Sequence, residues 1–429
     1  MGSEGLARGF LSVLSHFLAV FGSILVVHAH AMETLWPMPS TAPHGDGFRP
    51  LSRAPAGRGD FVLVTCQGGA EAALCRRQEE ILPLMKKGAW RRGVVTFRLP
   101  TPASDEPTFN PPDDFNPDLI FARAVIRSYG QVSGADDSER IQKLLALTGP
   151  ADWDNVHVWQ RDYRTEVSPV AIRSALIASL TAQSRPAEPA LGSGVESSLH
   201  TAIDQPMARP GDLVLDCMID SADRWWVGWH RAASPSSCWP GGIHPVSLPA
   251  DKVSRAWLKL DEALATFDLT LRPGTRAVEL GAAPGGACQR LLEAGLSVVG
   301  IDPALVDTRV AALKNFEQWR MRARDVRLKN FRGFDWVVAD MNIDPTSTLE
   351  SIGRIVTASG VRPEGIIATL KLPEWSRADS LGDWLKLFGQ WGYSPRARQL
   401  STGGREVCVV ALKSAGPAGR RRATRPPGR

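Results

Sequence analysis

The sequence lacks the features that mark a disulfide framework or a zinc finger. Its 429 residues contain six cysteines that are scattered along the chain, and no two of them form a CxxC pair. The eight histidines do not cluster along the sequence either, and no set of metal ligands is evident. These absences predict free thiols in a reducing compartment and no metal site.

A strong net charge is also missing. The formal charge of +5 arises from 50 basic and 45 acidic residues, and five arginines lie in the terminal segment 420–429. The body of the chain is therefore nearly neutral, so any contact with nucleic acid must come from a local patch. The hydrophobic content of 43% and the charged content of 22% exclude wholesale disorder. The length allows about three domains.

One long apolar run stands at the N-terminus. Residues 9–32 contain no Asp, Glu, Lys or Arg and are numerous enough to span a bilayer. The run also resembles a signal peptide, because Arg8 precedes it and residues 29–31 form a small-x-small cleavage site. The alternative is a start codon placed too far upstream, so that the protein begins at Met32. We favour this alternative and a cytoplasmic protein, because the downstream sequence is typical of the cytosol.

The segments before residue 250 predict small α+β modules. The β-prone runs are 61–65, 93–99, 119–132 and 156–160, the helical stretches are 68–84 and 168–183, and a hairpin is expected at 213–219 and 224–230. We divide this half into a leader and linker (1–59), a small α+β domain (60–114) and a second domain (115–245) with an exposed insertion at 184–212. The hairpin tryptophans, Trp225, Trp226 and Trp229, either stack on bases or fill a sheet core, and the core is favoured.

The second half predicts an α/β fold. Ser254 is a good N-cap residue, and apolar residues follow it at helical spacing up to Phe267. Strands and helices then alternate at 277–280, 285–294, 297–301, 335–339, 346–359, 365–370, 380–391 and 406–412. This alternation predicts a mostly parallel sheet with helices on both faces over residues 250–414. Residues 415–429 form a basic tail, which we expect to be disordered.

A glycine-rich turn is the sharpest local signal for a ligand. An apolar strand leads into Gly281-Ala-Ala-Pro-Gly-Gly286, which opens the next helix, and Asp302 ends the following strand. An acid at that place can accept hydrogen bonds from both hydroxyls of a ribose. The turn is not GxGxxG, so the fingerprint of pyrophosphate binding is absent. The combination favours a nucleoside ligand without pyrophosphate, and S-adenosylmethionine fits that description.

Two further strands end in charged residues. Asp340 ends the strand 335–339, and Lys371 ends the strand 365–370. Ligands of open α/β sheets bind outside the carboxyl ends of the strands, so both side chains are expected at the ligand crevice. Burial lowers the pKa of a lysine and a neighbouring carboxylate raises it. For either residue alone, a surface salt bridge is the simpler explanation.

These motifs together resemble the FtsJ-like ribose 2'-O-methyltransferases. The similar segments are 254–262, the glycine-rich turn, 339–341, 370–373 and 404–407. The resemblance places that family's Lys-Asp-Lys-Glu tetrad on Lys259, Asp340, Lys371 and Glu406. The chain looks most like the bacterial M-type enzymes that methylate a cytidine of 23S ribosomal RNA, through segments 120–123, 248–251 and 369–373.

The resemblance implies a Rossmann-like, S-adenosylmethionine-dependent methyltransferase domain preceded by ferredoxin-like and THUMP-like RNA-binding modules. In that reading Lys371 is the general base, Asp340 orients it, and Lys259 and Glu406 complete the charge network. The implied cofactor contacts are Glu279, Gly281, Ala282, Pro284, Gly285, Gly286, Asp302, Asp325 and Asp340. Two features depart from the family. Glu279 replaces the usual Asp, and Ala287-Cys288 replaces the usual Trp-Thr or Trp-Ser.

The expected activity is therefore 2'-O-methylation of a ribose in RNA, with 23S ribosomal RNA as partner and no metal or membrane involved. The alternative is a catalytically silent RNA-binding or ribosome-assembly factor on the same fold. The intact tetrad disfavours that alternative. A small-molecule methyltransferase ranks third, because the lysine-rich tetrad and the large N-terminal half argue against it.

Overall fold

Two seven-stranded sheets form the framework of the part of the chain that the structure describes. The computed structural model describes Pro55 and residues 60–100, 115–117, 119–161, 166–184 and 205–414. The predicted apolar leader 9–32 and the basic tail 415–429 lie outside the described residues, as do most of the linker 37–59 and of the insertion 184–212. Within the described ranges, no helix combines the length and apolar character needed to cross a bilayer.

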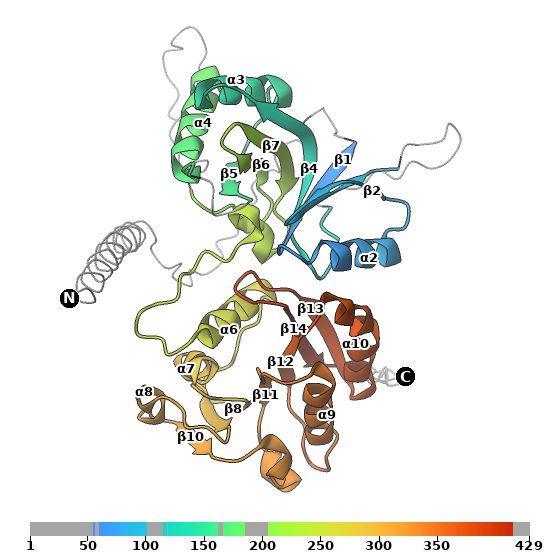
Figure 1. Ribbon diagram of the computed structural model, residues 1–429. Coiled ribbons are helices and arrows are strands. Elements are labelled where there is room, and N and C mark those ends of the chain that lie inside the picture. The colour runs from blue at the N-terminus through green and yellow to red at the C-terminus, as the bar shows by residue number, and fades with distance from the viewer. Residues whose placement is uncertain are drawn as a thin grey trace, which may run out of the picture. The chain divides into compact units, whose positions relative to one another are not determined.

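The first sheet contains the strands between residues 61 and 231 (Figure 1). From edge to edge the strands are β2 (Lys86–Arg91), β3 (Val94–Arg98), β1 (Phe61–Cys66), β4 (Ala122–Ser133), β7 (Arg224–Arg231), β6 (Leu213–Ser221) and β5 (Asn155–Gln160). All neighbours are antiparallel except β5 and β6. The predicted hairpin is confirmed as β6 and β7. Strands β1 and β4 pair directly, so both proposed N-terminal domains contribute to one sheet, and their boundary at 114/115 stays a prediction.

Three helices accompany this sheet, namely α2 (Glu71–Ile81), α3 (Asp137–Thr148) and α4 (Pro169–Ser184). Asp136 caps α3, because its carboxylate accepts a hydrogen bond from the Glu139 amide at 2.8 Å. Trp225 and Trp229 are fully buried in the core that α3 and α4 form with the sheet. Their predicted place in the core is thus confirmed, whereas Trp226 packs on the opposite face of the sheet.

The second sheet is mostly parallel, as predicted. Its order is β10 (Phe316–Trp319), β9 (Ser297–Ile301), β8 (Arg276–Leu280), β11 (Trp336–Ala339), β12 (Gly365–Lys371), β14 (Glu406–Lys413) and β13 (Tyr393–Arg398). The first five strands run parallel to one another. Strand β14 runs antiparallel to both β12 and β13.

Helices cover both faces of this sheet, also as predicted. The elements on one face are α6 (Arg255–Thr266) and α7 (Gly286–Glu293), and those on the other are α9 (Pro345–Val356) and α10 (Leu381–Gln390). Successive side chains along each strand point to opposite faces of the sheet. Val338 packs with the α6 side and Val337 with the α9 side. A short helix, α8 (Thr308–Ala311), and the 3-10 turns η1 (Pro235–Cys238), η2 (Pro240–Gly242), η3 (Ala323–Asp325), η4 (Leu328–Phe331) and η5 (Trp375–Ser380) complete the described elements.

Some elements were not predicted from the sequence. Helices α3 and α8 and strands β2, β10 and β13 were missed. Strand β2 is exposed along its whole length, so it carries no hydrophobic alternation to reveal it. Ser254 does stand at the N-cap of α6, but its side chain makes no capping hydrogen bond. All six cysteines are buried and unpaired.

Candidate active site

One edge of the second sheet gathers the predicted tetrad. Because β8, β11 and β12 are parallel, Gly281, Asp340 and Lys371 follow or end these strands at the same edge. Strand β14 runs the other way, so it begins at that edge, and its register pairs Glu406 with Lys371. Lys259 comes from α6, whose apolar side packs on the sheet.

The four side chains form a closed ring of alternating charge. The Lys259 amine lies 3.1 Å from Asp340 Oδ2 and 2.9 Å from Glu406 Oε1. The Lys371 amine lies 2.9 Å from Asp340 Oδ1 and 2.6 Å from Glu406 Oε2. Each amine therefore contacts both carboxylates, and each carboxylate contacts both amines. The arrangement has no net charge and holds all four groups at one place.

Partial burial strengthens the electrostatic interactions in this ring. The side-chain exposure is 13% for Asp340, 9% for Glu406 and 20% for Lys371. Burial alone would raise the pKa of Asp340, but the charges of Lys259 and Lys371 outweigh burial and lower it. Burial alone would lower the pKa of Lys371, but Asp340 and Glu406 outweigh burial and raise it. In the structure as it stands, Asp340 is ionised and Lys371 is protonated.

The glycine-rich turn brings the parts of the site close together. Gly281 has a φ of +83°, and a Cβ there would lie 2.9 Å from Met341 Cγ. A Cβ at Gly286 would lie 2.2 Å from Ser254 Oγ and 2.8 Å from the Trp257 nitrogen. Only glycine allows α6 and α7 to approach this closely. That approach sets the start of α6 and hence the position of Lys259 in the next turn.

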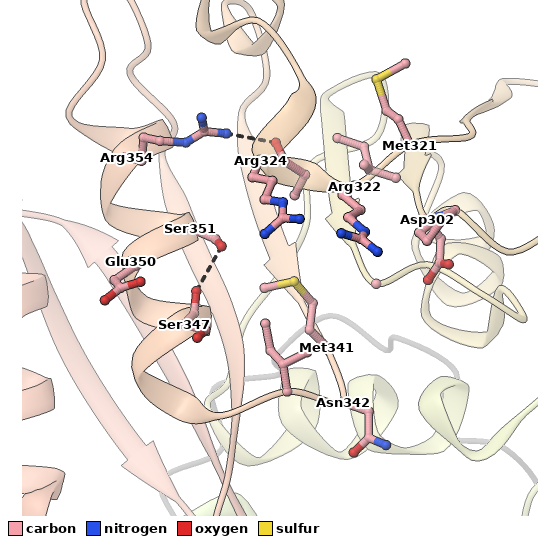
Figure 2. Close-up of a pocket in the computed structure, with 15 residues that line it drawn as sticks. Asp302, Met321, Arg322, Arg324, Met341, Asn342, Ser347, Glu350, Ser351 and Arg354 are labelled. Carbon is pink, nitrogen blue, oxygen red and sulfur yellow. Dashed lines mark hydrogen bonds between the residues drawn. The ribbon is translucent and has the colours of Figure 1, made fainter.

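A cavity of about 710 Å³ adjoins the strand ends, a size within the range of small-molecule sites. Its lining comprises Gly281, Ile301, Asp302, Pro303, Met321, Arg322, Ala323, Arg324, Met341, Asn342, Ile343, Ser347, Glu350, Ser351 and Arg354. Figure 2 draws all fifteen of these residues as sticks and labels ten of them. Met341 directly follows Asp340 in the chain, so the cavity and the charged ring are adjacent.

Asp302 lies in this cavity, at the end of β9. Its Oδ2 accepts a hydrogen bond from the Ala283 amide at 3.2 Å, and its Oδ1 accepts one from the Ala304 amide at 2.8 Å. These two amides fix the carboxylate between the glycine-rich turn and the loop after β9. Each carboxylate oxygen has a second lone pair with which it can accept a hydrogen bond from a ligand hydroxyl.

The basic side of the cavity was not predicted from the sequence. Arg322 and Arg324 lie near η3, and their guanidinium groups point the same way in Figure 2. Arg354, from α9, donates to the Ala323 carbonyl at 2.9 Å and so ties η3 to that helix. No motif relates these positions. The predicted contact nearest to them is Asp325, which belongs to η3.

Several predicted cofactor residues do not line the cavity. Asp325 belongs to η3 but is exposed, and its neighbours Ala323 and Arg324 line the cavity instead. The other residues outside the lining are Glu279, Ala282, Pro284, Gly285, Gly286 and Asp340. Their cofactor contacts stay predictions.

Glu279 is almost fully buried in β8, where its side chain hydrogen-bonds Cys288 of α7. Burial raises the pKa of Glu279 to about 8, although the hydrogen bond from Cys288 acts in the opposite direction. Both departures from the family pattern, Glu279 and Cys288, therefore contact each other beneath the turn. The pair provides the polar link between the strand and the helix that flank the glycine-rich loop.

Known proteins similar to this chain identify its family. The model of the FtsJ-like methyltransferase family matches residues 252–372, which include Lys259, Asp340 and Lys371. "Ribosomal RNA large subunit methyltransferase M" of Xanthomonas axonopodis pv. citri (strain 306) is 31% identical over 319 residues, covering 69% of this chain and 83% of the relative. The protein of that name from Xanthomonas oryzae pv. oryzae (strain MAFF 311018) is 30% identical over 318 residues, with the same coverages.

The chain belongs to the ribosomal RNA large subunit methyltransferase M family. It is thus a methyltransferase enzyme, and the expected Rossmann-like α/β fold class is confirmed. Among solved structures, TrmN from Thermus thermophilus matches with a TM-score of 0.29 and 13% identity, covering 82% of this chain and 99% of that chain. A likeness at that level adds nothing to the assignment.

Proposed function

We propose that this family member transfers a methyl group from S-adenosylmethionine to a ribose 2'-hydroxyl of 23S ribosomal RNA, at a cytidine. The ring of Lys259, Asp340, Lys371 and Glu406 beside the cavity of Asp302 is the observation that carries the proposal. The names of the curated relatives support an RNA of the large ribosomal subunit as the substrate.

The residues of the cavity fit an adenosyl cofactor. Asp302 offers acceptor oxygens for ribose hydroxyls, while Ile301, Met321 and Met341 give apolar surface for a purine. S-adenosylmethionine, when bound, would supply an electrophilic methyl group with sulfur as the leaving group. Further proposed contacts are Glu279, Ala282, Pro284, Gly285, Gly286, Asp325 and Asp340. These residues surround the turn and η3, or end strand β11.

The chain itself must position the hydroxyl and remove its proton. Lys371 ends β12 at the ring and keeps 20% of its side chain exposed, so a ribose can reach its amine. We assign Lys371 as the group that accepts the 2'-hydroxyl proton at Nζ as the oxygen bonds to the methyl carbon. Asp340 and Glu406 hold that amine in place, and Lys259 balances their charge.

This role requires Lys371 to lose a proton first. At an ordinary lysine pKa of about 10.4, only about one amine in a thousand is neutral near pH 7.4. The raised pKa of Lys371 makes the neutral form rarer still. A rate limited by the neutral amine should therefore increase with pH throughout the neutral range, which makes the proposed role testable.

RNA recognition is assigned to the N-terminal sheet. Its edge strand β2 exposes all six of its residues, including Lys86, Lys87, Trp90 and Arg91. Lys87 lies 5.9 Å from the ring centroid of Trp90. Amines that contact phosphates beside an aromatic face that stacks on a base are a common RNA-binding combination. The proposed place of action is the cytoplasm, where the enzyme would meet ribosomal RNA. The six free thiols agree with such a reducing compartment.

The decisive experiment is methyl transfer to RNA with a matched inactive variant. The purified chain should transfer labelled methyl from S-adenosylmethionine to 23S ribosomal RNA, and Lys371→Ala should not. Mapping ribose methylation in cells with and without the gene should reveal one 2'-O-methylated nucleotide that depends on it. If the chain binds RNA but transfers no methyl group and no nucleotide depends on it, the silent RNA-binding factor replaces this proposal.

A further inference from the structure

Two of the eight histidines meet in the first sheet, contrary to their separation along the sequence. The register of β5 and β6 pairs His157 with Asp216, and the register of β6 and β7 pairs Asp216 with Gly228. His230 lies two residues beyond Gly228, so it occupies the same face of the sheet. Their chain neighbours Val156, Cys217 and Trp229 face the opposite core.

The donor atoms of these residues lie at distances that a metal ion can bridge. His230 Nδ1 is 2.5 Å from Asp216 Oδ2, and His157 Nδ1 is 3.9 Å from Asp216 Oδ1. One donor atom from each residue lies within 4.8 Å of the others. Donors of a tetrahedral zinc site are about 3.3 Å apart, given metal–nitrogen bonds of about 2.0–2.1 Å. The observed spacings bracket that value.

The polar atoms of this cluster lack sufficient hydrogen-bonding partners. His157 is fully buried, yet neither of its ring nitrogens has a hydrogen-bond partner among the described residues, and Asp216 Oδ1 has none there either. Buried polar groups are normally paired, so unpaired ones call for a ligand or a structural cause.

The tautomer of His230 is set by a neighbouring carbonyl. His230 Nε2 lies 2.8 Å from the Ser237 carbonyl oxygen, which can only accept, so Nε2 carries a proton. In the neutral ring, Nδ1 is then an acceptor that faces the acceptor Asp216 Oδ2. Two acceptors in contact need a shared proton or a shared cation. A shared proton would satisfy only the contact between His230 and Asp216, whereas a metal cation would also bind His157.

We propose that His157, Asp216 and His230 bind a zinc ion that holds β5, β6 and β7 together. Two imidazoles and one carboxylate suit Zn²⁺, and the carbonyl that orients His230 is the usual outer partner of a zinc-bound histidine. A small hollow of about 10 Å³, lined by Asp216, His230 and Ser237, adjoins two of the three ligands and is about as large as one water molecule requires. Arg123 and Arg231 also line the hollow, and Asp216 is the only carboxylate among its described lining residues, so the carboxylate is essential for cation binding.

The test measures metal content and stability of the full-length, tag-free chain. The purified chain should retain about one zinc ion per molecule, as proteins with structural zinc sites do. After dialysis against a chelator, its melting temperature should fall and recover on addition of Zn²⁺. Cobalt in place of zinc should give the visible absorption of a tetrahedral site. His157→Gln and, independently, Asp216→Asn should weaken zinc binding by at least about tenfold.

His244→Gln provides the matched control. His244 is also a buried histidine beside a carboxylate, at 3.0 Å from Asp261 Oδ2, but it lies outside the cluster. This variant should bind zinc as the unaltered chain does. The proposal is overturned if the unaltered chain neither retains zinc nor gains stability from it. It is also overturned if His157→Gln and Asp216→Asn bind zinc normally, or if stability responds to pH alone.

Discussion

Replacing Lys371 by arginine separates the two roles that this lysine has in the ring. Its amine donates to Asp340 at 2.9 Å and to Glu406 at 2.6 Å, so it stabilises two partly buried carboxylates. Arginine keeps the positive charge and the donors, but it cannot lose a proton at working pH. Lys371→Arg should therefore preserve the charge balance of the ring and abolish proton acceptance.

Alanine at the same position removes both roles. The ring has two amines and two carboxylates, so Lys371→Ala leaves it with a net charge of −1 and only Lys259 as counter-ion. Leaving buried acceptors without partners costs about 1–3 kcal/mol of unfolding free energy. The lower part of that range applies, because 20% of the lysine side chain is exposed. Lys371→Arg should cost less, and thermal unfolding of both variants measures the difference.

Single-turnover methyl transfer to 23S ribosomal RNA, at saturating S-adenosylmethionine, tests the chemistry. Both variants should be slower by at least about 10²-fold, the low end for loss of a positioned base. The rate of the unaltered enzyme should increase about tenfold per pH unit, because the fraction of neutral lysine does so below its pKa. The raised pKa of Lys371 predicts no plateau in the neutral range. Lys386→Arg is the control, since Lys386 is exposed and pairs only with Asp383 among the described contacts.

Three results would refute parts of this reasoning. A rate near that of the unaltered enzyme for Lys371→Arg would eliminate the general base and leave a fixed positive charge as the role of Lys371. A pH-independent rate of chemistry would have the same meaning. A normal rate for Lys371→Ala, with correct folding, would remove the whole tetrad from catalysis.

Three further predictions concern the cofactor, the core and the RNA. Asp302→Ala should weaken S-adenosylmethionine binding by about one to two orders of magnitude, because unpaired ligand hydroxyls cost about 1–3 kcal/mol; unchanged affinity by calorimetry would exclude Asp302 from the site. Burial raises the pKa of Glu279 from 4.5 to about 8, so the folded chain keeps a proton that the unfolded chain releases in this window. Stability should then fall with rising pH there by up to about 1.4 kcal/mol per unit, and Glu279→Gln should flatten that dependence in denaturant titrations. Lys87→Ala and Trp90→Ala in the full chain should weaken RNA binding but leave cofactor affinity unchanged; equal RNA affinities in filter binding would contradict the assignment of β2.

The tetrad could be found from sequence because one topological rule links its members. Asp340 and Lys371 are 31 residues apart, and Lys371 and Glu406 are 35 apart, so no local pattern joins them. Parallel strands nevertheless end at the same edge of a sheet, and an antiparallel neighbour begins there. Apolar strands followed by charged residues were visible in the sequence, and the family resemblance supplied Lys259 and the order of the residues.

Other features depended on tertiary packing that no sequence period records. The arginines of the cavity come from the loop around η3 and from α9, and the two are joined by the bond of Arg354 to the Ala323 carbonyl. Loop positions carry no hydrophobic period, so their side chains could not be assigned a direction. The raised pKa of Lys371 likewise depends on the balance between burial and two carboxylates, which only distances and exposures decide.

The histidine cluster shows most directly why sheet registers must be known. His157 and Asp216 become neighbours only because β5 lies parallel to β6, an arrangement that requires α4 to connect them across the sheet. If the register between β5 and β6 shifted by one residue, either His157 or Asp216 would point to the opposite face of the sheet. The sequence predicted both strands but contained no signal for the register or for the parallel pairing. It therefore indicated scattered histidines, whereas the fold places two of them around a single buried carboxylate.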